Sequence, residues 1–210
     1  MTPILIFFFG VKPYMAVGTD LLFAAFTKLG GTVSLARQRL VPWRVVGQLC
    51  AGSLPAAVIT LVLDALKGWL PVVLVQQFGA AYGLGDATLA LVGLAAFLGH
   101  LYPVFFRFQG GKGVATAAGV ILAFNPWLGL ASLATWVIVA YFFRFSSLAA
   151  IVTAVFAPAY FLLGRGVAWD APGVMVLALA VMGVLLIWRH AENINRLLAG
   201  TESRLGSKKK

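Results

Sequence analysis

Two long apolar runs of this 210-residue chain are separated by Gly99-His100-Leu101-Tyr102-Pro103 and then by Gly110-Gly111-Lys112-Gly113-Val114-Ala115-Thr116. Glycines let the backbone turn tightly and aim its N–H groups at an anion, and a lysine adds a compact positive charge. A helix that starts near Val114 adds the positive end of its dipole. The stretch therefore predicts an anion-binding loop at a membrane surface. A glycine-rich connector whose lysine follows the positive-inside bias remains the alternative.

The composition is that of a membrane protein. Hydrophobic residues make up 61% and charged residues 10% of the chain, and the mean hydropathy is +0.97. Lipid must surround most of this apolar surface. Lys and Arg number 16 against 6 Asp and Glu, and they gather in short connecting segments. We expect this charge to meet lipid head groups and an anionic substrate, and no nucleic acid, because basic and aromatic residues do not interleave.

Cysteine and histidine are too few for a metal cluster. Cys50 is the single cysteine, which excludes an internal disulfide and a zinc site built on several thiolates. His100 and His190 are the only histidines, so we expect no metal. Residues Met1 to Gly10 have no basic start and no small-residue cleavage site, so no cleavable signal peptide is expected.

From about Ala51 onward, apolar runs of roughly membrane-spanning length are broken by Gly, Pro or basic residues. The predicted spans are 53–78, 84–106, 114–124, 127–143, 147–163 and 170–188, and a further crossing is predicted near 14–27. The breaks include Asn125-Pro126 and the glycine-containing segment from Gly164 to Pro172. These features predict an all-α, polytopic integral membrane helix bundle of about six to seven transmembrane helices, in a single domain over residues 1–210.

The charges agree with the predicted order of the spans. Four crossings between Val114 and Trp188 place the glycine-rich stretch and the C-terminal tail on the same side of the membrane. Basic residues flank both segments: Arg107, Lys112, Arg189, Arg196, Arg204 and Lys208 to Lys210. The positive-inside rule then predicts that both face the cytoplasm.

A polar segment follows the last apolar span directly and runs from Trp188 to Glu202. In a helix, His190, Asn193 and Leu197 share one face, with Arg196 close by. Such a face offers a proton acceptor, an amide and a guanidinium that binds phosphate in a bidentate way. The alternative is an amphipathic tail that lies on lipid head groups.

Ionisable residues also occur inside or at the ends of apolar runs. Asp64 and Lys67 are three positions apart and share a helix face, so they can neutralise each other. Charges at membrane depth indicate function, although a structural pair with a snorkelling Lys67 is an equal alternative. His100 ends an apolar run, where an imidazole often caps a helix.

The glycine-rich stretch does not fit a nucleotide-binding loop of Walker type. That loop requires Gly five positions before Gly111 and Ser or Thr after Lys112. Phe106 and Gly113 stand at these positions. The stretch therefore indicates phosphate recognition without a nucleotide or a magnesium ion.

Taken together, these segments resemble the bacterial acyl-phosphate:glycerol-3-phosphate acyltransferase family. The family's second motif looks like Gly99-His100, Pro103-Val104-Phe105, Phe108 and Gly110 to Thr116. Its third motif looks like His190, Asn193-Ile194, Arg196-Leu197, Gly200 and Glu202. A further family segment is similar to Leu63-Asp64-Ala65-Leu66-Lys67-Gly68. The resemblance runs from about Pro55 to Glu202.

The resemblance implies a multi-pass enzyme of the bacterial inner membrane whose active site faces the cytoplasm. It would move a fatty acyl group from acyl phosphate to the 1-hydroxyl of glycerol 3-phosphate, giving lysophosphatidate and phosphate for phospholipid synthesis. Its partners would be these two substrates and the lipid bilayer. No cofactor is implied, because acyl phosphate is already activated.

The resemblance also implies roles for individual residues. His190, Asn193 and Lys112 are predicted to be catalytic, with His190 accepting the hydroxyl proton. The substrate phosphates are predicted to bind Gly110, Gly111, Lys112, Gly113, Thr116 and Arg196. Supporting roles are predicted for His100, Asp64, Lys67 and Glu202.

Residues 1–54 are atypical for the family. Its first motif, a glycine-serine pair followed by Asn, a Gly-Ala-Thr-Asn run and Arg, is absent, and Gly52-Ser53-Leu54-Pro55 does not replace it. Our hypothesis is that residues up to about 50 come from a shifted reading frame or a wrong start, because Arg-Gln-Arg runs are what glycine-serine codons yield one base out of register. Resequencing the gene tests this. Without the motif, the activity of this chain is in doubt.

A small membrane transporter or channel for an anionic metabolite is the alternative function. Glycine breaks and charges inside apolar runs suit such a protein. However, the sequence shows no internal two-fold similarity, and its polar groups gather at one membrane face.

Overall fold

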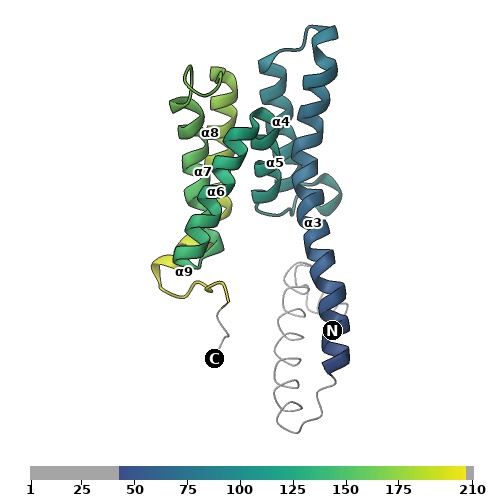
Figure 1. The fold of residues 1–210 in the computed structure, drawn as a ribbon, viewed down its shortest axis with the longest axis vertical. Helices are drawn as coiled ribbons and strands as arrows, with labels where there is room; N and C mark the ends of the chain where they lie inside the picture. Colours follow the sequence, from purple (N-terminus) through teal and green to yellow (C-terminus); the bar gives the residue numbers. More distant parts are fainter. Residues whose placement is uncertain (1–42, 207–210) are drawn as a thin grey trace. The chain divides into compact units, whose positions relative to one another are not determined.

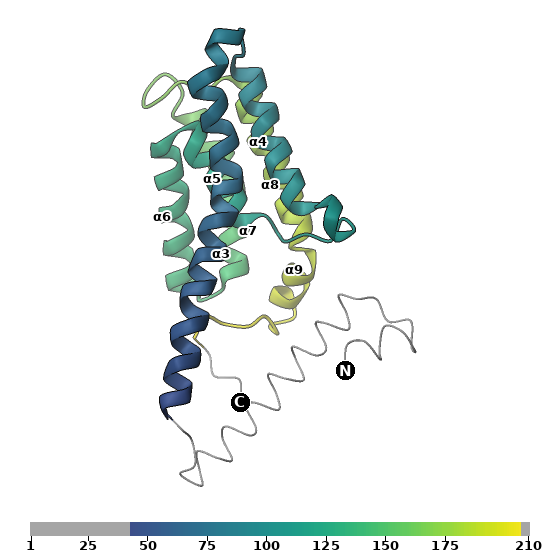
Figure 2. The same ribbon diagram turned by 90° about the vertical axis from the view of Figure 1, so that its right-hand side faces the viewer.

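The computed structural model describes residues 43–206, so the predicted crossing near 14–27 and most of the atypical segment 1–54 lie outside them. The chain divides into two compact units between Ala56 and Ala57, and the unit after this division holds every site described below. Figures 1 and 2 show the ribbon in two views.

The described residues form helices joined by short connections. Within them, a single bridge between Arg165 and Trp169 is the only β-type pairing. The α-helices are α3 (Trp43–Phe78), α4 (Asp86–Leu101), α5 (Val114–Phe124), α6 (Pro126–Phe143), α7 (Ser146–Leu163), α8 (Gly173–Arg189) and α9 (Ala191–Leu198). Two 3-10 helices are η1 (Gly79–Tyr82) and η2 (Val104–Phe106). The predicted all-α class is confirmed.

All six apolar runs predicted after Ala51 form helices, and three match closely: 114–124 is α5, 127–143 is α6 and 147–163 is α7. The break between α5 and α6 follows from Asn125-Pro126. The Asn125 side chain accepts the Leu128 N–H at 3.0 Å, and Pro126 fills the first helical position, where no N–H is needed.

Two predicted boundaries are wrong. The run 84–106 is not one helix, because α4 ends at Leu101. Pro103 has no N–H and restricts Tyr102 before it, so the helix stops there. At the other end, α3 begins at Trp43, well before the predicted residue 53, because its glycines do not interrupt the helix.

Within residues 43–206, three segments are long and apolar enough to cross a membrane: Ala51–Tyr82, α6 and α7. The pair α8 and α9, bent by 58°, makes a fourth candidate. Helices α4 and α5 are apolar but shorter. At 1.5 Å per residue, α5 is about 16 Å long and α6 about 27 Å. Because Asn125 alone joins them, the start of α5 lies part-way along α6 (Figure 2).

Helices α3 and α5 cross with their backbones close together. A Cβ atom at Gly68 would meet the backbone oxygen of Thr116, and a Cβ atom at Gly119 would meet that of Ala65. The fully buried Thr116 hydroxyl donates to the backbone oxygen of Asp64 at 3.0 Å. Small residues at a crossing permit this approach in membrane proteins. The crossing fixes the start of α5 against α3.

Candidate active site

The glycine loop, residues 110–113, joins the end of α4 to the start of α5. Gly110 donates its N–H to the backbone oxygen of Leu101 at 3.1 Å, so this amide is used by the fold. Gly113 has a φ of +79°, and a Cβ atom there would lie 2.5 Å from Leu101 and Phe97 side-chain atoms. Only glycine fits such a position without strain. Among the described residues, no acceptor takes the amides of Gly111, Lys112 and Gly113.

Arg189, the last residue of α8, holds the glycine loop. Its Nη2 donates to the backbone oxygen of Gly110 at 2.8 Å and to that of Gly111 at 3.2 Å. Since two carbonyls are bound from one side, the loop is fixed to the end of α8. The positive-inside pattern accounts for the charge of Arg189 but does not predict this contact with the glycine loop.

A hydrogen-bonded group, here named the Glu202 cluster, joins the glycine loop to α9. Lys112 Nζ donates to Asn193 Oδ1 at 2.6 Å, and Asn193 Nδ2 donates to Glu202 Oε1 at 2.7 Å. Ser147 Oγ, at the start of α7, donates to the same Oε1 at 2.6 Å. Arg196 Nε donates to Glu202 Oε2 at 2.7 Å. Helices α7 and α9 therefore both donate to one carboxylate, and Asn193 links the glycine loop to it.

These donors keep Glu202 ionised. The carboxylate side chain is only 7% exposed, and burial by itself would raise its pKa. The hydrogen bonds from Ser147, Asn193 and Arg196, with the charge of Arg196, outweigh burial and lower the pKa of Glu202 to about 2. The negative charge in turn holds Lys112 through Asn193.

The surroundings of Lys112 make its charged form less stable than that of a lysine in water. Burial lowers its pKa from 10.5, and Arg196 and Arg189 lower it further, while Glu202 and Glu192 act in the opposite direction. A cation surrounded by other cations attracts an anion, so the Lys112 side of the cluster favours phosphate.

His190 lies between α8 and α9 and is 2% exposed. Its Nδ1 is 2.8 Å from the backbone oxygen of Leu186. Because a carbonyl only accepts hydrogen bonds, Nδ1 carries the proton and Nε2 keeps a lone pair. Burial lowers the pKa of His190 below 6.5, which favours the neutral ring. The ring can therefore accept a proton at Nε2.

A second group, here named the Asp64 cluster, also borders the glycine loop. Lys67 Nζ is 2.7 Å from Asp64 Oδ1, and His100 Nδ1 is 3.7 Å from the same oxygen. A Cβ atom at Gly111 would lie 2.7 Å from His100 Nε2, so the imidazole packs directly on the loop. The Asp64 cluster thus borders the loop but shares no hydrogen bond with the Glu202 cluster.

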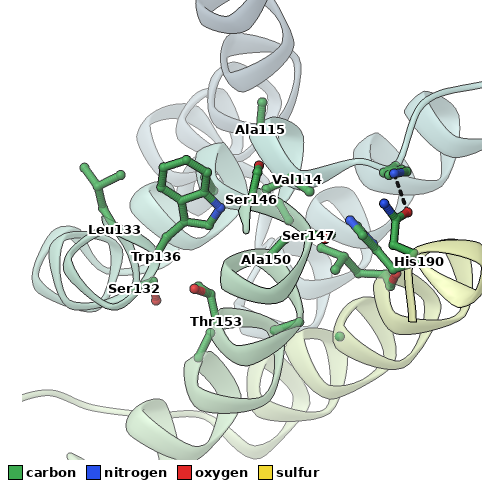
Figure 3. A pocket seen from close by; sticks show the side chains of 18 of the residues that line it. Val114, Ala115, Ser132, Leu133, Trp136, Ser146, Ser147, Ala150, Thr153 and His190 are labelled. Atoms are coloured by element: carbon green, nitrogen blue, oxygen red, sulfur yellow. Dashed lines mark hydrogen bonds between the residues drawn. The ribbon is translucent and has the colours of Figure 1, made fainter. Parts of the chain in front are cut away.

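The cavity beside the Glu202 cluster has a volume of about 740 Å³. Lys112, His190, Asn193 and Glu202 line it, and helices α3 and α5 to α8 supply mostly small or apolar side chains to most of the remaining wall. Figure 3 shows His190 on one side of the drawn residues and Ser132, Leu133 and Trp136 on the other. The cavity therefore combines a polar region with a long apolar one.

The segment after α9 closes part of this cavity. Residues 202–206 belong to the cavity wall. The Leu205 N–H donates to the Arg144 backbone oxygen at 2.6 Å, and Arg144 Nε donates to the Leu205 oxygen at 3.1 Å. The Arg204 guanidinium lies 5.6 Å from the centre of the Phe145 ring. These contacts hold Glu202 against the start of α7.

The structure brings most predicted site residues together, in two groups. The Glu202 cluster holds Lys112, Asn193, Arg196 and Glu202, with His190 on the same cavity, and this places the glycine loop and the tail at the same end of the helices, as predicted. Asp64, Lys67 and His100 form the other group. Thr116 is fully buried between α3 and α5, where its hydroxyl is already bonded. Among the described residues, no group of three or more His, Cys, Asp or Glu is placed to hold a metal ion.

Sequence reasoning missed two residues of the site. Arg189 stands beside His190, and this adjacency was the only available signal. Ser147 opens an apolar helix far from any motif, so nothing in its neighbourhood indicated that it binds Glu202.

Comparison with known proteins agrees with this architecture. A family-wide sequence description of glycerol-3-phosphate acyltransferase matches residues 43–200. A glycerol-3-phosphate acyltransferase of Cupriavidus pinatubonensis is 53% identical over 207 residues, covering 91% of this chain and 98% of its own. A glycerol-3-phosphate acyltransferase of Albidiferax ferrireducens is 61% identical over 160 residues, which cover 76% of this chain and 71% of the relative.

Solved structures of the integral membrane glycerol 3-phosphate acyltransferase PlsY have the same fold. Its glycerol 3-phosphate form has a TM-score of 0.66 at 34% identity, covering 90% of this chain and 96% of that one. Its lysophosphatidic acid form has a TM-score of 0.65 at 40% identity. The match covers 72% of this chain and 74% of the PlsY chain. This chain therefore belongs to the glycerol-3-phosphate acyltransferase family, and it is an integral membrane acyltransferase.

Proposed function

We propose that this chain transfers an acyl group from an acyl phosphate to the 1-hydroxyl of glycerol 3-phosphate, giving lysophosphatidate and inorganic phosphate. One observation carries the proposal: Lys112, His190 and Asn193 line one region of a cavity whose remaining wall is mostly apolar. Both substrates carry a phosphate, and one also carries a fatty chain. Relatives solved in a glycerol 3-phosphate form and a lysophosphatidic acid form support the proposed acceptor and the proposed product.

The apolar region suits the acyl chain in size. From Ser147 to Ala157, both on the cavity wall, α7 rises by about 15 Å. A fully extended chain advances about 1.2 Å per bond, so this length holds about twelve bonds. Burying the chain against α5 to α8 supplies binding energy that positions the acyl phosphate at the Glu202 cluster.

The cationic side of the cluster suits the phosphates. Lys112 and the free amides of Gly111 and Gly113 can stabilise the charge on the departing phosphate. Arg196 uses Nε on Glu202, and its side chain is 44% exposed, so its terminal nitrogens are accessible to the phosphate of glycerol 3-phosphate. Asn193 orients Lys112 between these two phosphates.

The transfer step balances without a cofactor. The 1-hydroxyl oxygen attacks the acyl carbonyl carbon, and its proton passes to Nε2 of His190. The bond between that carbon and the phosphate oxygen then breaks, and phosphate leaves with the electron pair. The mixed anhydride supplies the driving force, so no nucleotide is required.

The charges also suggest which way the site faces. Lys112, Arg189 and Arg196 lie at one end of the helices. The positive-inside rule places this end in the cytoplasm of a bacterial inner membrane, where a water-soluble substrate such as glycerol 3-phosphate reaches it.

Membranes that contain the chain test the proposal. With acyl phosphate and glycerol 3-phosphate supplied, we expect lysophosphatidate to form, and Lys112→Ala to lower the rate at least about hundredfold. Arg165→Ala is the matched control, because this basic residue lies in the connection between α7 and α8, away from the cluster. Equal rates in the two variants would contradict the assignment of Lys112.

The unusual N-terminal sequence provides a second arm of this experiment. If wild-type membranes are inactive and a family-like sequence in place of residues 1–54 restores transfer, then the chain is a damaged acyltransferase. If the wild type is active, the first family motif is dispensable here. If the graft is also inactive, the proposed function is wrong.

A further inference from the structure

Two consecutive carbonyls of the glycine loop bind the same nitrogen atom. Arg189 Nη2 lies 2.8 Å from the Gly110 oxygen and 3.2 Å from the Gly111 oxygen. Nη2 carries two hydrogens, so these two bonds use its full capacity as a donor. Gly110 is also fixed at its nitrogen, because its N–H donates to the Leu101 oxygen at 3.1 Å. Three successive peptide groups of the loop are therefore held by the surrounding fold.

The direction of the two carbonyls determines the direction of the amides bonded to them. A trans peptide group is planar, and its N–H points opposite to its C=O. The N–H groups of Gly111 and Lys112 belong to the two peptide groups that Arg189 binds. Both therefore point away from Arg189, and neither has an acceptor in the described part of the chain. Successive amides that are free and point the same way bind anions.

The glycine loop needs such a partner to keep this orientation. The peptide group between Gly110 and Gly111 has a glycine on each side, so it can rotate as a unit at little conformational cost. Rotation would replace its N–H with a carbonyl oxygen, which repels an anion. The two hydrogen bonds from Arg189 oppose this rotation.

Arg189 binds the loop and does not line the cavity. Lys112, His190 and Asn193 belong to the cavity wall, and Arg189 does not. Nε of Arg189 is buried and has no hydrogen-bond partner among residues 43–206. The guanidinium is thus covered at Nε and bound to the loop at Nη2, which indicates a residue that acts on the loop and not on the substrate.

We infer that Arg189 is a positioning residue, which binds the Gly110 and Gly111 oxygens and thereby aims the N–H groups of Gly111 and Lys112 at a substrate phosphate. The inference deepens the proposed function and rests on it for the identity of the substrate. Arg189 itself does not contact the phosphate, which distinguishes its role from that of Lys112. Inorganic phosphate, the proposed product, serves as the probe.

The first test observes the Lys112 amide directly. The chain has seven lysines, so protein labelled with ¹⁵N at the backbone nitrogen of lysine gives a simple amide spectrum in detergent. The Lys112 signal is identified by its loss in Lys112→Arg. When inorganic phosphate is added to the wild type, we expect the Lys112 amide proton to shift downfield, because it donates to a charged acceptor.

Two variants of similar side-chain length isolate the hydrogen bonds of Arg189. Arg189→Lys keeps a cation that can donate to both carbonyls, whereas Arg189→Met keeps only an apolar side chain. We expect phosphate to shift the Lys112 amide in Arg189→Lys and to leave it unmoved in Arg189→Met. Arg165→Ala is the control and should behave like the wild type, because Arg165 lies in the connection between α7 and α8.

The second test separates kcat from KM in the transfer reaction, per amount of folded protein. Misdirected amides no longer stabilise the departing phosphate, so kcat should fall about thirtyfold in Arg189→Met and about fivefold in Arg189→Lys. The KM for glycerol 3-phosphate should stay within about threefold of the wild type in both variants, because Arg189 does not contact this substrate.

Four results would overturn the inference. The Lys112 amide of the wild type could ignore phosphate, or it could shift equally in wild type and Arg189→Met. The KM for glycerol 3-phosphate could rise about tenfold with kcat unchanged, which would mean that Arg189 binds this substrate directly. Failure of both variants to fold would mark Arg189 as a structural residue. A wild type that shows the phosphate shift but no transfer contradicts the proposed function and leaves the positioning role in place.

Discussion

The Glu202 cluster and the Asp64 cluster are built from similar residue types but are held very differently. At Glu202, donors from the glycine loop through Asn193, from α7 and from α9 converge on one carboxylate that is 7% exposed. At Asp64, the shortest contact is with Lys67 on the same helix, and Lys67 is 60% exposed. In the Glu202 cluster, hydrogen bonds from distant segments meet at a buried carboxylate. In the Asp64 cluster, the one short side-chain contact is local to α3, and His100 of α4 lies 3.7 Å from Asp64. The two clusters therefore differ in how firmly distant segments are joined, more than in their charges.

The largest effect is expected from removing the central carboxylate of the Glu202 cluster. Glu202→Ala leaves Ser147 and Asn193 without their acceptor and frees Lys112 from its position. We expect the rate of lysophosphatidate formation, per amount of folded protein, to fall about hundredfold. Asp86→Ala is the control, because Asp86 is an exposed acidic residue in the first turn of α4, and its rate should stay within about twofold of wild type. A similar loss in this control would show that the effect is not specific to the Glu202 cluster.

The pH profile sharpens the comparison, because it reports Lys112 and His190. His190 must be neutral to accept a proton, so the rate rises with pH through its pKa, which burial places below 6.5. Lys112 must be charged, so the rate falls through its pKa, which burial places below 10.5. We expect Lys112→Arg, which stays charged, to move only the alkaline limb to higher pH. An alkaline limb at the same pH in this variant would assign it to another group.

A smaller effect is expected at Thr116, which the family resemblance assigned to phosphate binding. Its hydroxyl bonds the Asp64 backbone oxygen inside the crossing of α3 and α5. Thr116→Val should therefore lower stability by about 1 kcal/mol, seen as a lower thermal midpoint in detergent, with little change in KM for glycerol 3-phosphate. A large rise in KM with unchanged stability would contradict this and would support the predicted role of Thr116 in phosphate binding.

The smallest effect is expected at Lys67. An exposed pair three residues apart on a helix contributes at most about 0.5 kcal/mol. Lys67→Ala should therefore leave the transfer rate within about twofold of wild type and the thermal midpoint nearly unchanged. A loss like that of Lys112→Ala would show that the Asp64 cluster takes part in the reaction.

The sequence predicted the helices well wherever a local signal existed. Asn125-Pro126 separated α5 from α6, and apolar runs located α5, α6 and α7. The end of α4 was missed, because apolar residues continue past Leu101 and hide the effect of Pro103. The difference in length between α5 and α6 places the glycine loop part-way along α6. This difference could be predicted, because the predicted boundaries of both helices agree closely with the structure.

The sequence predicted which residues belong to the site but not which of them contact one another. Lys112 and Asn193 are 81 positions apart, and no periodicity connects them. The predicted order of the spans placed them on one side of the membrane, and only the family resemblance grouped them in one site. Arg189 and Ser147 act through backbone carbonyls and a distant carboxylate, which leave no local pattern. The cavity was not predictable from the sequence. Small residues such as Ala150 and Ala157 line it, but small residues are also common where helices pack together, so they do not indicate a cavity.

The most direct test of the central claim is the stoichiometry of transfer in membranes containing the wild-type chain. Labelled glycerol 3-phosphate and an acyl phosphate are supplied, and lysophosphatidate and released phosphate are measured in the same samples over time. The account predicts that the two products appear in equal amounts and only when both substrates are present. Phosphate release without lysophosphatidate, or lysophosphatidate formed only from a different acyl donor, would contradict it.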